Sequence, residues 1–407
     1  MLVKNKKILK FYYLIILLSF MHSILRLNDT SSFSLYRVLM PISLFLLIFF
    51  YKKSIFPTII VLFLILYNFI LSYFYTDNFS HYIALSLHYV SILNIYLVVL
   101  YIYRIDGFEK LYKFLYYFIL LSLFIAITEI IFQYRLPNTA IYFDGSVSAF
   151  NWNQNEFGAI LLSFSPFLLV FEKNNFIKTT IISIILYLMY INDSKLALIG
   201  LLIGIVIYNL KKNILQIHPI IKKIIIFLSL LCIPILIYLP YDNIYVSFRD
   251  YDISLYTLLG IPIEHILSLT PFPDTGGSDT TRANAIIYAL IEFKNSYFMG
   301  IGCGNTLTML EKPEYTLKTA KSIHNLPIQL VVENGFIILI GYALLIKIFF
   351  KLFLVKHKLD QIDLLLVVAI PSLFIGMMGS SVGIFSDYFL ISSISLIYIL
   401  KKYRKKL

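Results

Sequence analysis

Residues 55–75 of the chain read IFPTIIVLFLILYNFILSYFY, an apolar run without one charged side chain. About 20 apolar residues in a helix cross the hydrocarbon core of a bilayer, so this run is long enough to span a membrane. It is typical of the whole chain, because 59% of the 407 residues are hydrophobic and only 14% are charged. A soluble protein of this length could not bury so much apolar surface. A soluble enzyme, a disordered chain and a nucleic-acid-binding domain are therefore excluded.

Similar apolar runs recur along the chain and predict an all-α integral membrane protein with about 12 transmembrane helices. The first run lacks a small-residue cleavage site after it, which indicates an uncleaved first span. The predicted spans are 8–25, 34–51, 55–75, 82–103, 112–134, 156–171, 177–191, 195–210, 222–240, 326–350, 362–380 and 385–400.

The net charge of +12 has an explanation in topology. If the N-terminus lies inside, most of the 34 lysines and arginines fall in cytoplasmic segments, as the positive-inside rule requires. We therefore expect a multi-pass membrane protein with both termini cytoplasmic. Neither an acidic soluble partner nor a nucleic acid is needed to explain the charge.

One predicted outside segment is far longer than the other connections. It divides the chain into transmembrane helices over 1–240, an extracytoplasmic loop domain with amphipathic helices over 241–325, and transmembrane helices with a basic cytoplasmic tail over 326–407. A loop of this length in a compact protein is usually functional. The unusual polar residues of the chain gather at the outer ends of the spans and in this loop.

An asparagine-rich motif opens the sixth predicted span, where residues 151–158 read NWNQNEFG. Asn151, Asn153 and Asn155 offer neutral hydrogen-bonding groups beside a tryptophan ring, a composition that suits sugar hydroxyls and sugar faces. A polar helix cap with an interfacial tryptophan explains the same residues without a ligand.

Lys195 begins the eighth predicted span at the outer membrane boundary. The positive-inside rule and the helix dipole both disfavour a cation there, which indicates an anionic partner. A salt bridge to Asp193 or a snorkelling side chain is the alternative.

Arg282 stands near the start of a predicted helix in the long loop. Helical spacing aligns it with Ile286 and Phe293, so we expect its side chain to point into the apolar face of that helix. A buried guanidinium is costly unless it is paired, and arginine is the best bidentate phosphate binder. The alternative is a structural pair with Glu292 or Asp279.

The end of the long loop holds further candidates. Residues 300–305 read GIGCGN, so Gly302 lies in a stretch that permits close approach of the backbone to a ligand, although a simple loop is the commoner meaning. His324, followed by Asn325, has an ordinary pKa that suits a general base, although a lone histidine is more often structural. Glu333 is a carboxylate inside a predicted span and so a functional candidate, unless Gln329, four residues before it, simply satisfies it.

These motifs, in this order, resemble the O-antigen ligase and polymerase superfamily over roughly residues 150–342. The resemblance implies a membrane glycosyltransferase related to the GT-C class, without a metal or other cofactor, that acts on undecaprenyl-diphosphate-linked oligosaccharides. It implies a protein of the bacterial cytoplasmic (inner) membrane whose catalytic residues are His324, as the candidate base, and Arg282. Arg282 and Lys195 would hold the diphosphate, and Lys195 replaces the family's usual arginine by a point charge. The other candidate substrate-binding residues are Asn151, Asn153, Asn155, Gly302, Asn325 and Glu333.

Three functions are compatible with these residues. The first is a polymerase of surface polysaccharide (O-antigen or capsule type) that joins lipid-linked repeat units, with membrane lipids, a flippase and a chain-length regulator as partners. The second is a ligase that passes the finished glycan to lipid A-core or another acceptor. The third is a polysaccharide flippase without enzymatic activity. The first predicted outside loop has Asp29 but no Asp-x-Asp pair, which argues against metal-dependent relatives.

Overall fold

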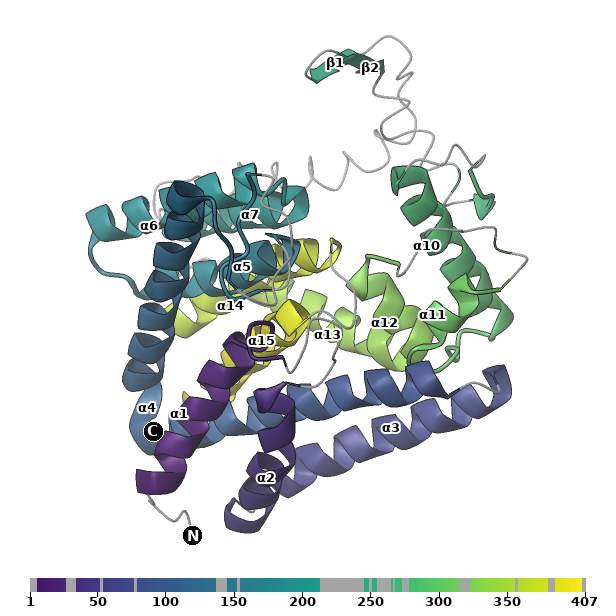
Figure 1. Cartoon of the computed structure of the whole chain (residues 1–407), viewed down its shortest axis with the longest axis horizontal. Coiled ribbons are helices and arrows are strands. Elements are labelled where there is room, and N and C mark those ends of the chain that lie inside the picture. Colours follow the sequence, from purple (N-terminus) through teal and green to yellow (C-terminus); the bar gives the residue numbers. More distant parts are fainter. Residues whose placement is uncertain are drawn as a thin grey trace.

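The computed structural model shows a bundle of helices with one small antiparallel hairpin (Figure 1). The prediction of a helical membrane protein is confirmed in its main point. The elements are α1 (Lys6–Phe20), α2 (Leu35–Phe50), α3 (Ile55–Tyr75), α4 (Ser80–Phe132), α5 (Gln154–Phe171), α6 (Asn175–Ile191), α7 (Lys195–Lys212), β1 (Tyr245–Phe248), β2 (Tyr251–Ser254), α10 (Ser278–Asn295), α11 (Asn305–Leu310), α12 (Leu326–Asn334), α13 (Phe336–Phe353), α14 (Gln361–Met377) and α15 (Phe385–Arg404). The structure describes all residues except 1–5, 27–33, 52–53, 77–78, 137–144, 152–153, 213–244, 249–250, 255–264, 266–267, 273–277, 313–314, 316–322, 356–357, 380–384 and 405–407.

Within these described ranges, four helices are long and apolar enough to cross a membrane: α3, the kinked α4, α5 and α13. Two of them, α3 and α13, leave most of their apolar side chains on the surface, as Phe63 and Ile340 illustrate. Such surfaces are stable in lipid and not in water. The total of about 12 spans and the division at 240 and 325 stay predictions, and the predicted span 222–240 lies outside the described residues.

Predicted spans 82–103 and 112–134 form one element, α4, which is kinked at Gly107. Gly107 has a φ of +78°, a conformation that glycine adopts without the penalty of a side chain. In Figure 1 the first half of α4 runs beside α3, and the second half turns away from it. The kink therefore falls between the two predicted spans, and no loop intervenes.

The predicted span 326–350 is wrong as a single helix, because the chain breaks at Gly335 into α12 and α13. Gly335 has a φ of +67°, and a side chain there would collide with the backbone of Met299. The amide of Phe336 instead donates to the carbonyl of Phe298 at 3.2 Å. The apolar count missed this break because apolar residues continue on both sides of the short polar stretch Glu333-Asn334-Gly335.

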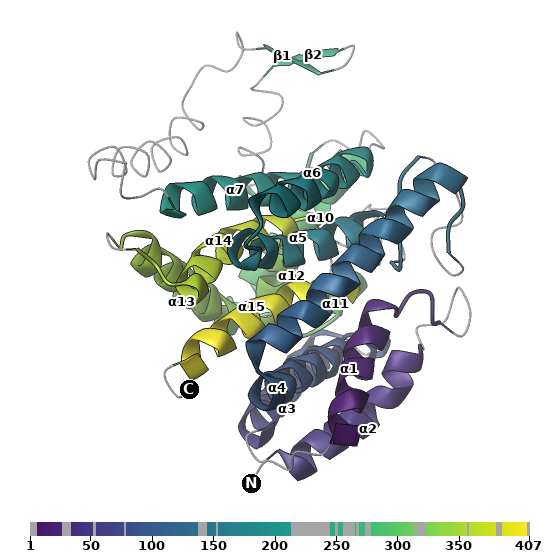
Figure 2. The same cartoon turned by 90° about the vertical axis from the view of Figure 1, so that its left-hand side faces the viewer.

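Small residues bring α7 and α14 close together. A Cβ on Gly200 would lie 2.6 Å from the Ser372 carbonyl oxygen, and the Ser372 hydroxyl donates to the Gly200 carbonyl at 2.7 Å. Gly204 faces the same serine one turn further on. Small residues four apart are a known device for packing helices in membranes. Figure 2 shows α7 lying along α14 and α5.

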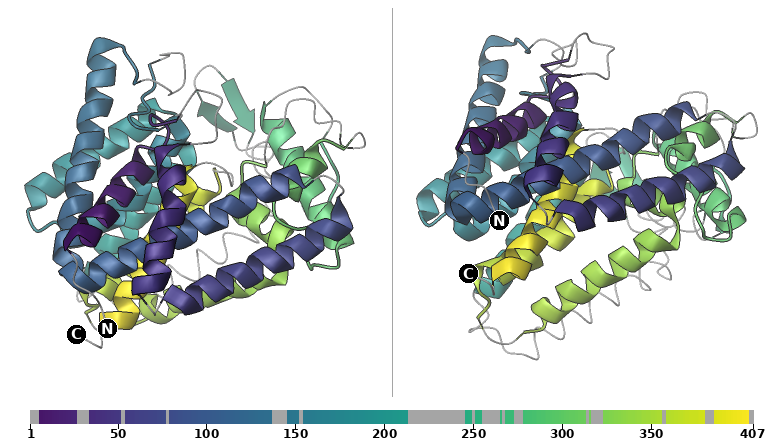
Figure 3. Two further views of the ribbon diagram at one scale, coloured as in Figure 1. Left: turned by 60° about the horizontal axis from the view of Figure 1, so that its bottom comes forward. Right: turned by 90° about the horizontal axis from the view of Figure 1, so that it is seen from below.

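At the other end of α7, Lys211 is buried at 3% exposure and reaches the C-terminal end of α13. Its Nζ donates to the carbonyl of Leu352 at 3.1 Å and to those of Phe353 and Val355. The last carbonyls of a helix lack the amide four residues on that would otherwise bond to them, so the lysine caps the end of α13. The first turn of α1 and the last turn of α15 lie at one end of the molecule (Figure 3); the side of the membrane on which they lie stays a prediction.

Candidate functional site

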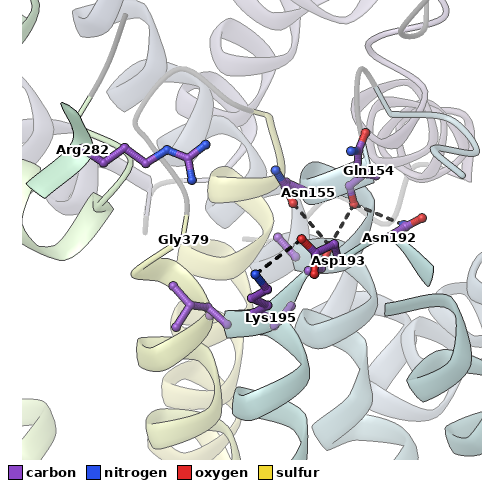
Figure 4. Close-up of a pocket in the computed structure, with 12 residues that line it drawn as sticks. Gln154, Asn155, Asn192, Asp193, Lys195, Arg282 and Gly379 are labelled. Carbon is purple, nitrogen blue, oxygen red and sulfur yellow. Dashed lines mark hydrogen bonds and ion pairs between the residues drawn. The ribbon is translucent and has the colours of Figure 1, made fainter. Parts of the chain in front are cut away.

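A cavity of about 380 Å³ lies where α5 begins, α6 turns into α7, α14 ends and α10 begins (Figure 4). Its polar wall includes Gln154, Asn155, Asn192, Lys195 and Arg282. Three of the polar places that the sequence predicted therefore meet in one cavity. The glycine motif around Gly302 is not part of its lining.

Lys195 is the first residue of α7 and lines the cavity. Its Nζ lies 3.6 Å from a carboxylate oxygen of Asp193, so the predicted alternative, a pair with this acid, is present. The two side chains are 65% and 75% exposed, and ion pairs this exposed contribute about 0–1 kcal/mol. Such a weak pair leaves the lysine able to turn to a stronger anion.

Arg282 also lines the cavity, but the prediction that it points into the apolar face of its helix is wrong. The side chain is exposed, and Figure 4 shows it reaching across from α10 towards the wall that holds Asn155 and Lys195. The packed part of α10 begins only afterwards, with Ala285 and Ala289 fully buried. Arg282 stands in the first turns, ahead of that packing.

Among the described side chains, Arg282 forms no ion pair with either of its predicted acidic partners. Glu292 accepts a hydrogen bond from Lys312 Nζ at 2.7 Å and another from the Tyr315 hydroxyl. The side chain of Asp279 lies outside those that the structure describes. The guanidinium is thus presented to the cavity with no ion pair in the described part of the chain.

His324 is half-buried just before α12 and has a φ of +51°. Burial lowers the pKa of its imidazole, and the charge of Arg282 lowers it further. His324 therefore lies within the electrostatic range of Arg282, although it is not part of the cavity lining. The predicted base and the predicted diphosphate ligand come together, and the base is neutral at pH 7.

The three predicted sugar-binding asparagines are placed differently. Asn155 lines the cavity and accepts a hydrogen bond from the Ser194 hydroxyl at 3.4 Å. Asn151 is 4% exposed, lies outside the cavity lining and donates to the Ser148 carbonyl at 3.2 Å, which holds a turn. Asn153 lies outside the described residues. The amide wall of the cavity is therefore Asn155 with its neighbour Gln154.

Gly302, Asn325 and Glu333 belong to a second, buried network beside the broken helix. The Gly302 amide donates to the Glu333 carbonyl at 2.9 Å. The Glu333 carboxylate is fully buried, and its Oε1 accepts from Gln329 at 3.0 Å and from Thr306. The predicted contact with Gln329 is therefore present, but it does not satisfy the whole carboxylate, because Oε2 has no hydrogen-bond partner among the described residues. Asn325 caps α12 by accepting from an amide three residues on, at 3.1 Å. Their predicted role in binding substrate stays a prediction.

The sequence analysis did not single out Asn192, which lines the cavity at 1% exposure. Its amide oxygen accepts from the Val147 amide at 2.8 Å, and its amide nitrogen donates to the Val147 carbonyl at 2.9 Å. This side chain joins the segment before α5 to the α6–α7 turn. The only feature of the sequence that points to Asn192 as a cavity residue is its position directly before Asp193.

Residues 180–343 match the model of the O-antigen ligase family. The matched stretch contains Lys195, Arg282 and His324. The predicted resemblance to the O-antigen ligase and polymerase superfamily is thus confirmed over this stretch, which is about two fifths of the chain.

One relative is the teichuronic acid biosynthesis protein TuaE of Bacillus subtilis (strain 168). The two chains are 25% identical over 316 residues, which is 74% of this chain and 61% of the relative. The chain therefore spans about three fifths of the length of the curated relative that it matches.

Proposed function

We propose that the protein is a glycosyltransferase that polymerises a surface polysaccharide from undecaprenyl-diphosphate-linked repeat units at the outer face of the cytoplasmic membrane. The observation that carries this proposal is the convergence of Lys195 and Arg282, from separate elements, on one cavity with an amide wall. The match to the O-antigen ligase family and the similarity to a teichuronic acid biosynthesis protein support a function in surface polysaccharide synthesis.

The proposed reaction breaks the bond between the anomeric carbon of the donor glycan and its diphosphate. A hydroxyl of the acceptor sugar forms the new glycosidic bond, and its proton passes to the neutral imidazole of His324. Negative charge grows on the departing diphosphate, and Arg282 and Lys195 stabilise it. Cations held beside a leaving group can lower such a barrier by several kcal/mol once the bound glycan displaces water from around them. The reaction needs no metal in this scheme.

The same scheme accounts for the relation between the two catalytic groups. His324 must be neutral to accept a proton, and the nearby guanidinium favours that state. Arg282 therefore serves both as an anion ligand and as the charge that keeps the base ready. Gln154 and Asn155 are placed to hold sugar hydroxyls on the opposite wall.

A ligase is the second candidate, since the matching family is described by that activity. It would use the same donor and the same cavity but a different acceptor. The name of the relative refers to teichuronic acid biosynthesis and does not separate the two activities. We favour the polymerase because Lys195 stands where the family usually has arginine and because the amide wall suits sugars.

The test is chain growth by the purified full-length protein, in nanodiscs, on a defined undecaprenyl-diphosphate-linked repeat. Loss of one donor that stabilises a transition state costs about 10²–10³ in rate, and we expect Arg282→Ala to lose this much. Lys294→Ala is the control, because it removes an exposed outer lysine from the same helix without touching the cavity. Undiminished chain growth by Arg282→Ala would refute the site. Single transfer to a lipid A-core acceptor, without growth of the chain, would indicate the ligase.

A further inference from the structure

A second cavity lies at the other end of α10, away from Arg282. Its volume is about 280 Å³, near the lower end of the range of small-molecule sites, which is about 300–1,000 Å³. The last turns of α3 and α10, together with the turn that follows α10, form its walls. We name this cavity the α3–α10 pocket, and its lining includes Phe74, Tyr75, Glu292, Asn295, Ser296 and Met299.

Hydrogen bonds fix the wall that follows α10. The Ser296 hydroxyl donates to the Phe293 carbonyl at 2.8 Å and accepts from the Gly300 amide at 3.2 Å, which closes the turn after the helix. The Tyr67 hydroxyl donates to the Met299 carbonyl at 2.6 Å and so ties this turn to α3. The polar groups of the pocket are therefore held in place before a ligand binds, which lowers the cost of binding.

Glu292 supplies a carboxylate to the pocket, although the residue is only 7% exposed. Its Oε1 accepts hydrogen bonds from Lys312 and from Tyr315, both at 2.7 Å. Within the described part of the chain, these are the hydrogen bonds that the carboxylate accepts, and neither involves Oε2. An ionised carboxylate has about four acceptor positions, so Glu292 keeps acceptor capacity for a ligand in the pocket.

Asn295 and two aromatic rings complete the lining that the argument needs. Asn295 is the last residue of α10, and its exposed amide forms no hydrogen bond with another described residue, so it can both donate and accept. Phe74 and Tyr75 bring their rings from the end of α3. A carboxylate, an amide and aromatic rings around a small cavity suit a sugar, because its hydroxyls donate and accept while its apolar face covers a ring.

The same residues disfavour the other ligands that a membrane surface offers. An ionised carboxylate only accepts hydrogen bonds and repels a phosphate, so neither a phospholipid headgroup nor a lipid diphosphate suits the place beside Glu292. An acyl chain would cover Glu292 and Asn295 without giving them partners, which costs free energy. A glycan therefore fits this pocket better than either part of a lipid.

The helix α10 connects the two cavities. Arg282 lines the first cavity, whereas Glu292 and Asn295 line the second. These residues are 10 and 13 positions beyond Arg282, which is about 15–20 Å along an α-helix. A chain of sugars can span this distance, whereas a single sugar ring cannot.

We propose that the α3–α10 pocket is a binding subsite for the glycan chain, remote from the bond that forms in the first cavity. The inference rests on the proposed function, because it takes the first cavity as the place where the glycosidic bond forms. The reacting end of the donor glycan lies beside Arg282, and sugars further along the same chain occupy the pocket. The pocket thus contributes to affinity for the glycan and not to the chemical step.

The two cavities are expected to differ in kinetics. Asn295→Ala removes hydrogen bonds to the glycan, so we expect the KM for the lipid-linked donor to rise about 3–10-fold while kcat stays nearly unchanged. Arg282→Ala lowers kcat instead. Asn295→Gln keeps the amide and should recover part of the affinity.

The decisive experiment measures binding without any reaction. A lipid-free oligosaccharide of two repeats of the defined unit is titrated by calorimetry into the full chain in phosphatidylcholine nanodiscs. We expect the Kd to rise about 10-fold for Glu292→Gln and about 3–10-fold for Asn295→Ala. Lys294→Gln is the control on the same helix and should bind as the wild type does, since Lys294 lines neither cavity.

The outcomes separate this inference from the proposed function. If both pocket variants bind the oligosaccharide as the wild type does while chain growth still depends on Arg282, the subsite is refuted and the proposed function stands. If the wild type joins no lipid-linked repeats but binds the oligosaccharide through Glu292 and Asn295, the proposed function falls and the glycan site stands. A wild type that does not bind the oligosaccharide also overturns the subsite.

A lipid in the pocket would give a different result. Native mass spectrometry would then show a phospholipid that the wild type retains and Asn295→Ala loses, with the same Kd for the oligosaccharide in both, and this would refute the proposal. Should Glu292→Gln fail to fold, as judged by its melting temperature in detergent, Asn295→Ala carries the test, because its exposed side chain holds no other described residue.

Discussion

At the residue scale, the two cations of the cavity differ in their surroundings. Lys195 has Asp193 at 3.6 Å, whereas Arg282 has no ion pair with any side chain that the structure describes. The sequence predicted both residues from their types and positions. It could not predict the direction of Arg282, because helical spacing gives the face of a residue but not where the packed part of the helix begins.

The pH dependence of the reaction follows from His324. Its pKa is lowered in the folded protein, so the neutral, active form persists as the pH falls below 6.5 and is lost only below that lowered pKa. We expect the acid limb of kcat/KM to lie below pH 6.5. Removing the Arg282 charge raises the pKa of His324, so the acid limb of Arg282→Gln should move to higher pH, and that of Arg282→Lys should move less.

Rate profiles on the lipid-linked repeat between pH 4.5 and pH 8 check this expectation for the wild type and both variants. The control is His324→Gln, whose residual activity should show no acid limb from this group. An acid limb above pH 7 in the wild type would contradict the assignment of His324 as the base.

At the element scale, the break between α12 and α13 provides hydrogen-bond acceptors for the glycine motif at residues 300–305. The amides of Ile301 and Gly302 donate to the carbonyls of Val332 and Glu333, both at 2.9 Å, so the glycine motif serves as a partner for the end of α12. Hydropathy predicted most helix bounds to within a few residues, since apolar runs must be helical in lipid. It joined α12 and α13 because nothing in an apolar count reports a positive φ at Gly335.

Gly335→Ala should destabilise the protein. An alanine is strained by about 1–3 kcal/mol at this φ, and its Cβ would also collide with the Met299 backbone. Gly341→Ala is the matched control in α13, because a Cβ there meets nothing within 4 Å and should stabilise the helix by about 0.5–1 kcal/mol. Melting temperatures in detergent compare the two. Equal melting temperatures would show that the break is not as described.

At the scale of the whole molecule, the cavity depends on how closely α7 and α14 pack, because each supplies one of its walls. The pairing uses Gly200 and Gly204 of α7, whose spacing of four is visible in the sequence, and Ser372 of α14. The convergence itself could not be predicted from spacing. Residues near 154, 195, 282 and 379 meet only because distant helices pack together, and a single sequence carries no record of such contacts.

Gly200→Ala should therefore affect both stability and catalysis. The added Cβ would lie 2.6 Å from the Ser372 carbonyl oxygen, and overpacking of this kind costs about 1–3 kcal/mol. The helices must separate, so the walls of the cavity shift and chain growth falls together with the melting temperature. Ile199→Ala, at the exposed neighbouring position, is the control and should change neither strongly. If Gly200→Ala kept the wild-type rate of chain growth, the shape of the cavity would not depend on how closely α7 and α14 pack.

The helix α7 carries a lysine near each end, and the two have different tasks. Lys211 holds the end of α13, and Lys195, about 24 Å away along an ordinary α-helix, faces the cavity. Because a helix moves as a stiff rod, a displacement of its end at Lys211 also shifts its end at Lys195. Neutralising Lys211 should thus affect the cavity at the other end of α7 without any direct contact between the two.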